Sequence, residues 1–303
     1  IISDFVTNIS DVEFDYFQNR ELDVVFQENL SGIGDFSFDN YKWTGALTLP
    51  ETLTGIGERA FYNCTGFASE LIIPQNVSGI GEEAFYNCNQ LSGNLIIQDY
   101  LIDIGDGAFV NCSSLDGYLQ ISDLTAFNIS SYENLFLGTN FTELRASSTD
   151  GTISGFEFDS FVNFLGDLTL IETVGAVGDR AFDGFGFQAN LNSFGTVFEI
   201  GDYAFSGDTF IGSLEIYSQY VGKGAFYNCT FDGVLTFPTE NTIEVDDYAF
   251  YNCDGFISGL KISREMERIG NYSFYNNSSL GGEFILSEIP EDFNCSFVES
   301  DVF

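Results

Sequence analysis

Apolar residues recur along this chain in two short patterns that follow one another at a fixed period. The first is L-x-L or L-x-I, as in Leu71-Ile72-Ile73, and the second is I-G-x-x-A-F, as in residues 80–85. In the first pattern, two apolar residues face one side and the middle residue faces the other, which predicts a short β-strand. In the second, Gly permits a turn and a small Ala makes room for a large Phe. Both patterns return about every 24 residues, which predicts a stacked array of structural repeats.

One Phe per repeat marks the register along almost the whole chain. These anchor residues lie 21 to 27 positions apart and are Phe17, Phe38, Phe61, Phe85, Phe109, Phe136, Phe161, Phe182, Phe205, Phe226, Phe250 and Phe274. A single turn cannot bury its own Phe, whereas stacked turns bury a continuous column. We therefore predict a repeat solenoid of about 12 turns of 21–27 residues. A parallel β-sheet should form one face, with short turns or helical pieces opposite.

The full repeat pattern resembles that of a known family. Residues 71–91 read L-x-I-P-x-x-V-x-x-I-G-x-x-A-F-x-x-C-x-x-L, which resembles the BspA-type leucine-rich repeat, and the resemblance covers about residues 12–290. It implies a right-handed, curved leucine-rich-repeat (LRR) solenoid with adhesive or binding surfaces, on a surface or secreted protein without catalysis. Phe exceeds Leu at core positions here, and the repeats are irregular at about 122–164. We expect a single solenoid domain over residues 1–303, without clear capping domains.

Charge narrows the possible functions. The chain has 46 acidic and 9 basic residues, a net charge of −37 and no His. Nucleic acid binding needs clustered Lys and Arg, so no nucleic acid partner is expected. No apolar run is long enough for a transmembrane helix, so membrane insertion is not expected either. Without His, Ser-His and Cys-His nucleophiles are unavailable, and we predict a non-enzymatic protein. A glycan-cleaving enzyme that uses two carboxylates stays a remote alternative.

Asparagine usage predicts the compartment. Of 23 Asn residues, 12 begin an N-x-S/T sequon, the acceptor for N-glycosylation in secreted proteins. They are Asn8, Asn29, Asn63, Asn76, Asn111, Asn128, Asn140, Asn228, Asn271, Asn276, Asn277 and Asn294, of which Asn276 and Asn277 overlap. We predict an extracellular glycoprotein, secreted or on the cell surface. The alternative is that Asn suits turns next to Ser and Thr. The chain opens with Ile1 and shows no leader, so we expect a mature or fragmentary chain.

Five cysteines occupy one repeat position. Cys64, Cys88 and Cys112 are 24 residues apart, as are Cys229 and Cys253, whereas Cys295 lies outside this register. Equivalent positions on adjacent turns lie roughly 4.8 Å apart, but parallel side chains keep their Cβ atoms too far apart for the usual disulfide. We favour buried free thiols over disulfides, and both remain open.

An acidic residue precedes the anchor Phe by three positions in most repeats. These residues would form a column about 5 Å apart: Asp35, Glu58, Glu82, Asp106, Asp179, Asp202 and Asp247. The column could load Ca²⁺ through its carboxylate oxygens. The alternative is a solvated edge that keeps the protein soluble, and we expect no other cofactor.

The middle residues of the L-x-L elements form a possible contact face. Seven of them are β-branched, in a chain that is otherwise acidic: Val25, Thr48, Ile72, Ile96, Thr169, Thr236 and Ile285. A neutral, partly apolar sheet face is a candidate for contact with a partner. The alternative is that β-branched residues merely suit strands.

Both ends of the chain are apolar and lack a recognisable cap. Ile1, Ile2 and Phe5 at one end could meet Phe293, Phe297 and Phe303 of another copy. Such head-to-tail contacts would build a filament. We therefore predict a structural or adhesive extracellular glycoprotein that acts through its repeat surface, with head-to-tail polymerisation into a filament as the more specific form of this prediction. The alternative is a monomeric binding module that recognises a protein or a glycan. The ends could instead belong to a fragment or carry unrecognised caps.

Overall fold

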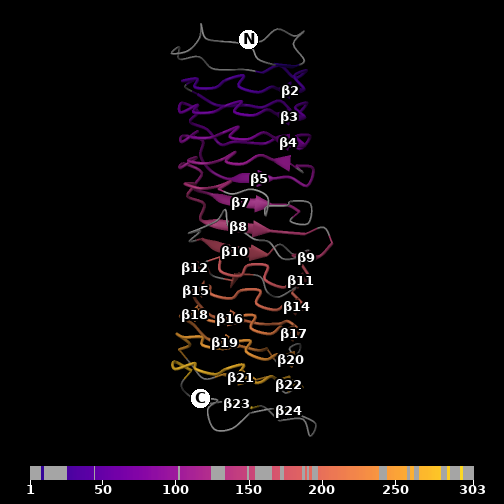
Figure 1. The fold of residues 1–303 in the computed structure, drawn as a ribbon, viewed down its shortest axis with the longest axis vertical. Helices are drawn as coiled ribbons and strands as arrows, with labels where there is room; N and C mark the ends of the chain where they lie inside the picture. Colours follow the sequence, from indigo (N-terminus) through magenta and orange to yellow (C-terminus); the bar gives the residue numbers. More distant parts are fainter. Residues whose placement is uncertain are drawn as a thin grey trace. The chain divides into compact units, whose positions relative to one another are not determined.

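The computed structural model gives each part of the chain as a stack of short turns (Figure 1). It describes residues 26–43, 45–101, 103–123, 134–148, 150–153, 166–170, 174–185, 197–238, 244–257 and 266–280, with the short segments 8–9, 188–189, 191–192, 260–262, 285–286 and 294–295. The chain divides into two compact units. Unit 1 comprises residues 1–145 and 159–162, and unit 2 comprises residues 146–158 and 163–303.

The I-G pattern forms a parallel sheet in each unit. In unit 1 the sheet has five strands: β1 (Asn8–Ile9), β2 (Gly32–Ile33), β3 (Gly55–Ile56), β4 (Gly79–Ile80) and β6 (Asp103–Ile104). In unit 2 it has seven: β9 (Thr152–Ile153), β11 (Ala176–Val177), β14 (Glu199–Ile200), β17 (Tyr220–Val221), β20 (Glu244–Val245), β22 (Arg268–Ile269) and β24 (Asn294–Cys295). Each strand pairs with its equivalent one repeat away, as Ile33 does with Ile56.

The L-x-L elements form further parallel ladders. In unit 1 these strands are β5 (Leu95–Ile97), β7 (Tyr118–Ile121) and β8 (Glu143–Ala146, whose last residue belongs to unit 2), and β5 pairs with β7. In unit 2, β10 (Asp167–Leu170) pairs with β13 (Leu191–Asn192), and a second group comprises β16 (Leu214–Glu215), β19 (Leu235–Thr236), β21 (Lys261–Ile262) and β23 (Ile285–Leu286). A third ladder of unit 2 joins β12 (Gln188–Ala189), β15 (Thr209–Phe210) and β18 (Thr230–Phe231).

The predicted solenoid of stacked parallel strands is confirmed, with three corrections of detail. The I-G segment was expected to be a turn, but its main chain pairs between repeats, with Gly81 N–H donating to Ile56 O at 2.8 Å. The prediction of a sheet on one face was therefore incomplete, because the I-G segments form a parallel sheet of their own. The expected helical pieces are turns throughout the described residues. The described part of the chain gives about eight turns of the solenoid against the twelve predicted, although the two I-G sheets take one strand from each of twelve repeats. The repeats near residues 10–25 and 124–165 fall largely outside the described residues.

The anchor Phe side chains stack through the core, as the repeat pattern predicted. In unit 1 the ring centroids of Phe61 and Phe85 lie 5.1 Å apart, and those of Phe85 and Phe109 lie 5.5 Å apart. In unit 2 the rings of Phe226 and Phe250 lie 5.0 Å apart and nearly parallel, at 7°. These side chains are fully buried, and such aromatic contacts add roughly 0.5–1.5 kcal/mol per pair beyond burial.

The Gly of the I-G pattern is required by how closely the turns approach one another. A Cβ added at Gly81 would lie 2.3 Å from the main-chain N of Glu58, and one at Gly57 would lie 2.4 Å from Asp35 Oδ1. A side chain fits there only where the preceding turn leaves room for it, as in unit 2, where Asp246 holds this position and its N–H donates to Val221 O at 2.8 Å. Two residues earlier, a Cβ at Gly79 would find its nearest neighbour 4.0 Å away. The repeat therefore holds two kinds of Gly, of which only the second lies close against the preceding turn.

Candidate binding surfaces

The outward face of the L-x-L strands carries the exposed apolar side chains expected from the sequence. Ile72 is 66% exposed between the buried residues Leu71 and Ile73. Thr48 is exposed, and Ile96, Thr169 and Thr236 are partly exposed, each between two buried apolar residues. Val25 lies outside the described residues, and so does the side chain of Ile285. Arg145 in β8 and Glu215 in β16 hold the same outward position, so the row is charged there. In unit 1, Thr48, Ile72 and Ile96 give an uncharged, β-branched stretch that suits contact with a partner.

A polar groove of about 590 Å³ lies over strands β2 to β4 of unit 1. Its floor is bare main chain, because Gly32, Gly55 and Gly79 occupy the outward strand positions. Hydroxyl side chains line it and are engaged, since Thr54 Oγ1 donates to Ser31 O at 2.8 Å. Sequence reasoning missed this groove because it treated the I-G segment as a turn.

The predicted carboxylate column links adjacent turns through the main chain. Asp35 Oδ1 accepts a hydrogen bond from the backbone N–H of Glu58 at 2.8 Å. Equivalent bonds run from the N–H of Asp202 to Asp179, of Lys223 to Asp202, and of Asn271 to Asp247, at 2.8, 2.8 and 2.6 Å. Glu58, Glu82 and Asp106 are exposed. Within the described residues, no three metal-ligating side chains converge. The aspartates thus have a structural role, and calcium binding by the column stays a prediction without support from these contacts.

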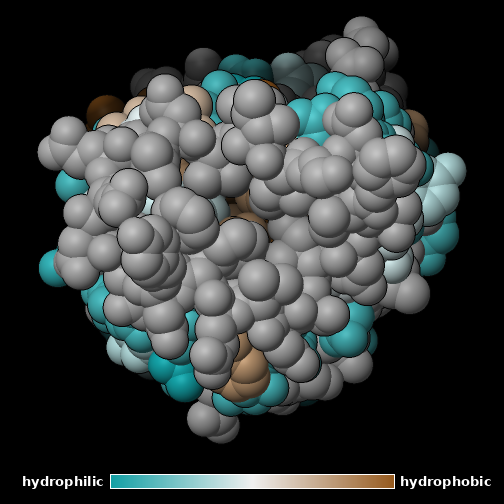
Figure 2. All heavy atoms as spheres, turned by 90° about the horizontal axis from the view of Figure 1, so that it is seen from above, coloured by the Kyte–Doolittle hydropathy of each residue, from teal (hydrophilic) through white to brown (hydrophobic). Residues whose placement is uncertain are grey.

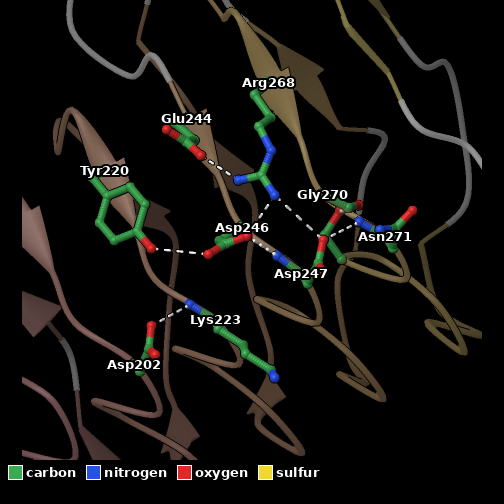
Figure 3. A network of polar contacts seen from close by, with 10 residues as sticks. Asp202, Tyr220, Lys223, Glu244, Asp246, Asp247, Arg268, Gly270 and Asn271 are labelled. Carbon is green, nitrogen blue, oxygen red and sulfur yellow. Dashed lines mark hydrogen bonds and ion pairs between the residues drawn. The ribbon is translucent and has the colours of Figure 1, made fainter.

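A network of charged side chains joins three turns of unit 2 on the I-G sheet (Figure 3). Arg268 on β22 contacts Glu244 on β20 and lies 2.8 Å from Asp246 Oδ1. The Tyr220 hydroxyl donates to Asp246 Oδ2 at 2.9 Å. Burial raises the pKa of the Asp246 carboxyl, but hydrogen bonds from the Asp247 N–H, Tyr220 and Arg268 outweigh it and leave the pKa below its usual value. The network therefore acts as an ionic clamp between turns.

Asparagine side chains form a second set of links, which the sequence did not reveal. Asn63 Nδ2 donates to Asn40 Oδ1 at 2.8 Å, and Asn87 Nδ2 donates to Asn63 Oδ1 at 2.6 Å. In unit 2, Asn252 Nδ2 donates to Asn228 Oδ1 at 2.8 Å. We call these rows the Asn ladder. Its members have positive φ, 57° at Asn63 and 56° at Asn87, a conformation that Asn tolerates better than most residues.

The sequons fall into different structural settings. Asn63 and Asn228 belong to the Asn ladder, so local structure already explains an Asn there. Asn277 is buried, and its Oδ1 accepts a bond from Cys253 N–H at 2.7 Å. Asn76 and Asn140 are exposed, and their Nδ2 atoms donate to carbonyl groups of the preceding repeat. The side chains of Asn8, Asn128 and Asn294 lie outside the described residues. Glycosylation stays a prediction.

The five repeat cysteines are buried free thiols, as the sequence favoured. Each donates to the carbonyl of an anchor Phe in the preceding turn; Cys88 Sγ, for example, lies 3.0 Å from Phe61 O. Burial is the main cause that raises the pKa of Cys88 and Cys112 well above the usual value. The Cys88 and Cys112 thiols therefore stay protonated, and all five cysteines act as small core residues that donate to the preceding turn.

A family comparison decides how these repeats are classified. The model of the "BspA type Leucine rich repeat region (6 copies)" matches residues 7–135, 128–255 and 198–300. The chain belongs to the BspA-type leucine-rich repeat family. The resemblance inferred from residues 71–91 is thereby confirmed, over the whole of the range from about 12 to 290 that the sequence suggested.

Two solved structures are similar to this BspA-type chain at low sequence identity. One is a leucine-rich cell surface protein from Faecalibacterium prausnitzii A2-165, with 19% identity, a TM-score of 0.31, and coverage of 93% of this chain and 88% of that one. The other is a leucine-rich repeat protein from Bacteroides ovatus ATCC 8483, with 14% identity, a TM-score of 0.45, and coverage of 92% and 66%. No curated protein matches the sequence.

The remaining surfaces give less information. The described atoms visible in the end-on view of Figure 2 are mostly hydrophilic. No helix among the described residues has the length and apolar character needed to cross a bilayer. The residues predicted for end-to-end contact, Ile1, Ile2, Phe5, Phe293, Phe297 and Phe303, lie outside the described part of the chain.

Proposed function

We propose that this BspA-type chain is a non-catalytic binding or adhesive module of a secreted or cell-surface protein. It contacts a protein partner through the outward face of the L-x-L strands. The observation that carries the proposal is Ile72, an isoleucine 66% exposed in an L-x-L element that forms no strand of its own. The same position of the neighbouring repeats holds the uncharged residues Thr48 and Ile96. Such a face buries apolar area on contact without desolvating a charge, in a protein that is otherwise strongly acidic.

Family membership and the lack of His support a binding role over catalysis. Asp35, Asp179, Asp202 and Asp247 bond to main-chain N–H groups and Asp246 pairs with Arg268, so the positions of these carboxylates are explained by turn stacking. Glycosylation and head-to-tail stacking remain hypotheses about the same extracellular role. Stacking in particular depends on terminal residues outside the described part of the chain.

The experiment is a binding screen of the purified chain against arrays of extracellular proteins and glycans. Ile72→Asp places a charge on the proposed face, and Ile257→Asp is the control, since Ile257 is 72% exposed in unit 2. We expect at least one protein to bind the wild type and the control but to lose about tenfold affinity for Ile72→Asp. Equal binding by both variants, or binding to glycans alone, would contradict the proposed face.

A further inference from the structure

Six partly exposed tyrosines form one continuous cluster on unit 2. The tyrosine cluster comprises Tyr203, Tyr227, Tyr248, Tyr251, Tyr272 and Tyr275, and Tyr272 is the most exposed, at 42%. Three of them directly follow an anchor Phe, with ring centroids 5.0 Å apart for Tyr227 and Tyr251 and 5.4 Å apart for Tyr251 and Tyr275. The other three lie two residues before an anchor Phe, and Tyr248 stacks on Tyr272 at 5.4 Å. The two rows touch, since Tyr272 and Tyr275 lie 5.6 Å apart.

The row before the anchor Phe is held in an unfavourable backbone conformation. Tyr203, Tyr248 and Tyr272 have φ of 55°, 60° and 56°, which bulky residues rarely adopt. Gly224 occupies the equivalent position in the turn between Tyr203 and Tyr248, with φ of 60°. A Cβ there would lie 2.5 Å from Tyr203 Cε1, so Gly224 leaves space for the Tyr203 ring to cross towards Tyr227. The positive φ is a property of this repeat position, since Phe36, Glu83 and Arg180 adopt it as well. At this position the last turns differ only in placing tyrosine there.

Earlier turns show which charged group contacts a tyrosine ring from this repeat position. At the equivalent position in unit 1, Arg59 places its guanidinium 3.9 Å from the centre of the Tyr62 ring, and it pairs with Asp39 and Glu83 at 3.7 and 3.5 Å. In unit 2, Arg180 lies 5.1 Å from the centre of the Tyr203 ring and pairs with Asp183 at 2.7 Å. In both units this repeat position combines a guanidinium, a tyrosine ring and a carboxylate.

The last turns keep the rings but replace both the arginine and the carboxylate that follows the anchor Phe, since Tyr251 and Tyr275 stand where Asp39 and Asp183 do. Tyr248 and Tyr272 stand where Arg59 and Arg180 stand in earlier turns. Asp202 and Asp247 directly precede Tyr203 and Tyr248, and residues 201–280 contain 11 acidic and 4 basic side chains. A surface of this kind attracts cations, and tyrosine and arginine are both enriched in protein interfaces.

We propose that the tyrosine cluster is a docking surface for an arginine-bearing segment of a partner protein. The partner's guanidinium groups would supply the contact that Arg59 and Arg180 make within this chain. The cluster and the Ile72 face use different residues, so either proposal can fail without the other. A lysine-bearing segment would be attracted by the same charge, but its ammonium group lacks the planar guanidinium that stacks on a ring.

The test compares oligoarginine and oligolysine peptides of equal length as probes, by titration calorimetry at physiological salt. We expect oligoarginine to bind at least about threefold more tightly. The double variant Tyr272→Leu/Tyr275→Leu should abolish this preference, whereas Tyr100→Leu should not, since Tyr100 is 71% exposed outside the cluster. Equal affinity for both peptides, or a preference that survives the double variant, would show that bulk charge alone attracts them and would overturn the proposal.

A second variant guards against loss of folding. Tyr248→Arg places arginine where Arg59 and Arg180 are tolerated at φ of 51° and 55°, so the turn should still form. The new guanidinium should occupy the neighbouring rings and remove the arginine preference. Ile257→Arg adds the same charge outside the cluster and should lower both affinities while keeping the preference. If the two variants behave alike, the specific site is refuted.

Discussion

Replacing Gly81 by Ala tests how closely the turns must approach. The added Cβ would lie 2.3 Å from Glu58 N and 2.5 Å from Gly57 C. Both are main-chain atoms, so no rotamer change relieves the clash. Reaching an ordinary contact of 3.4 Å from 2.3 Å requires the turns to part by about 1 Å. That movement would stretch the 2.8 Å bond from Gly81 N–H to Ile56 O.

The expected loss of stability follows from these two effects. Overpacking of this size costs about 1–3 kcal/mol. Weakening one or two cross-turn hydrogen bonds adds about 1 kcal/mol each. Gly81→Ala should therefore destabilise unit 1 by about 3 kcal/mol. Gly79→Ala is the matched control, because its Cβ would meet nothing closer than 4.0 Å and its change should stay within about 0.5–1 kcal/mol, in the stabilising direction.

Urea unfolding followed by tryptophan fluorescence measures this difference. Trp43 is the only tryptophan and is buried in unit 1, with its ring 4.7 Å from that of Phe38. Its emission therefore reports on the unit that carries both substitutions. If Gly81→Ala and Gly79→Ala unfold at the same urea concentration, the reasoning from turn spacing is refuted.

Three further predictions follow from the links between turns. Asn87→Ala should cost about 2 kcal/mol, because it combines a positive φ with loss of the ladder bond to Asn63, and Asn87→Gly should cost less. Urea melts that rank Gly at or below Ala would contradict this. The thiol of Cys88 should resist alkylation at pH 7–9 in the folded chain, because burial raises its pKa. In urea the same thiol should react quickly. Equal alkylation rates in the folded and unfolded states would contradict burial. The pKa of Asp246 is lowered on folding. Its contribution to the free energy of unfolding is therefore present above the unfolded pKa of about 4 and is lost as pH falls through the lower folded pKa. Asp246→Asn should therefore destabilise at pH 7 but hardly at pH 2, and urea midpoints at the two pH values check it.

The sequence predicted the repeats because their signal is long-range and redundant. The anchor Phe series and the L-x-L series keep the same period, and both depend on burial, which stacking satisfies. The Phe61, Phe85 and Phe109 stack therefore appeared as expected. The ladder of two-residue I-G strands did not, since two residues are too few to show a period of two.

The contacts of several candidate site residues could not be predicted from the sequence, because they depend on side-chain geometry. A column of acids is visible in the sequence, but only coordinates show that Asp35 accepts the backbone N–H of Glu58. Asn63 was read as a glycan acceptor because it begins a sequon, whereas its positive φ and its bond to Asn40 are invisible in a single sequence. The outward position of Ile72 was predictable, because alternation within L-x-L determines it.

The most direct test of the proposed function is hydroxyl-radical footprinting of the chain, free and bound to a protein partner found in the binding screen. Ile72 is highly exposed in the free chain, and Ile257 is exposed to a similar extent in unit 2. A partner that docks on the L-x-L strands should protect Ile72 from oxidation and leave Ile257 unchanged. Protection of Ile257 with continued oxidation of Ile72 would place the contact elsewhere and contradict the account.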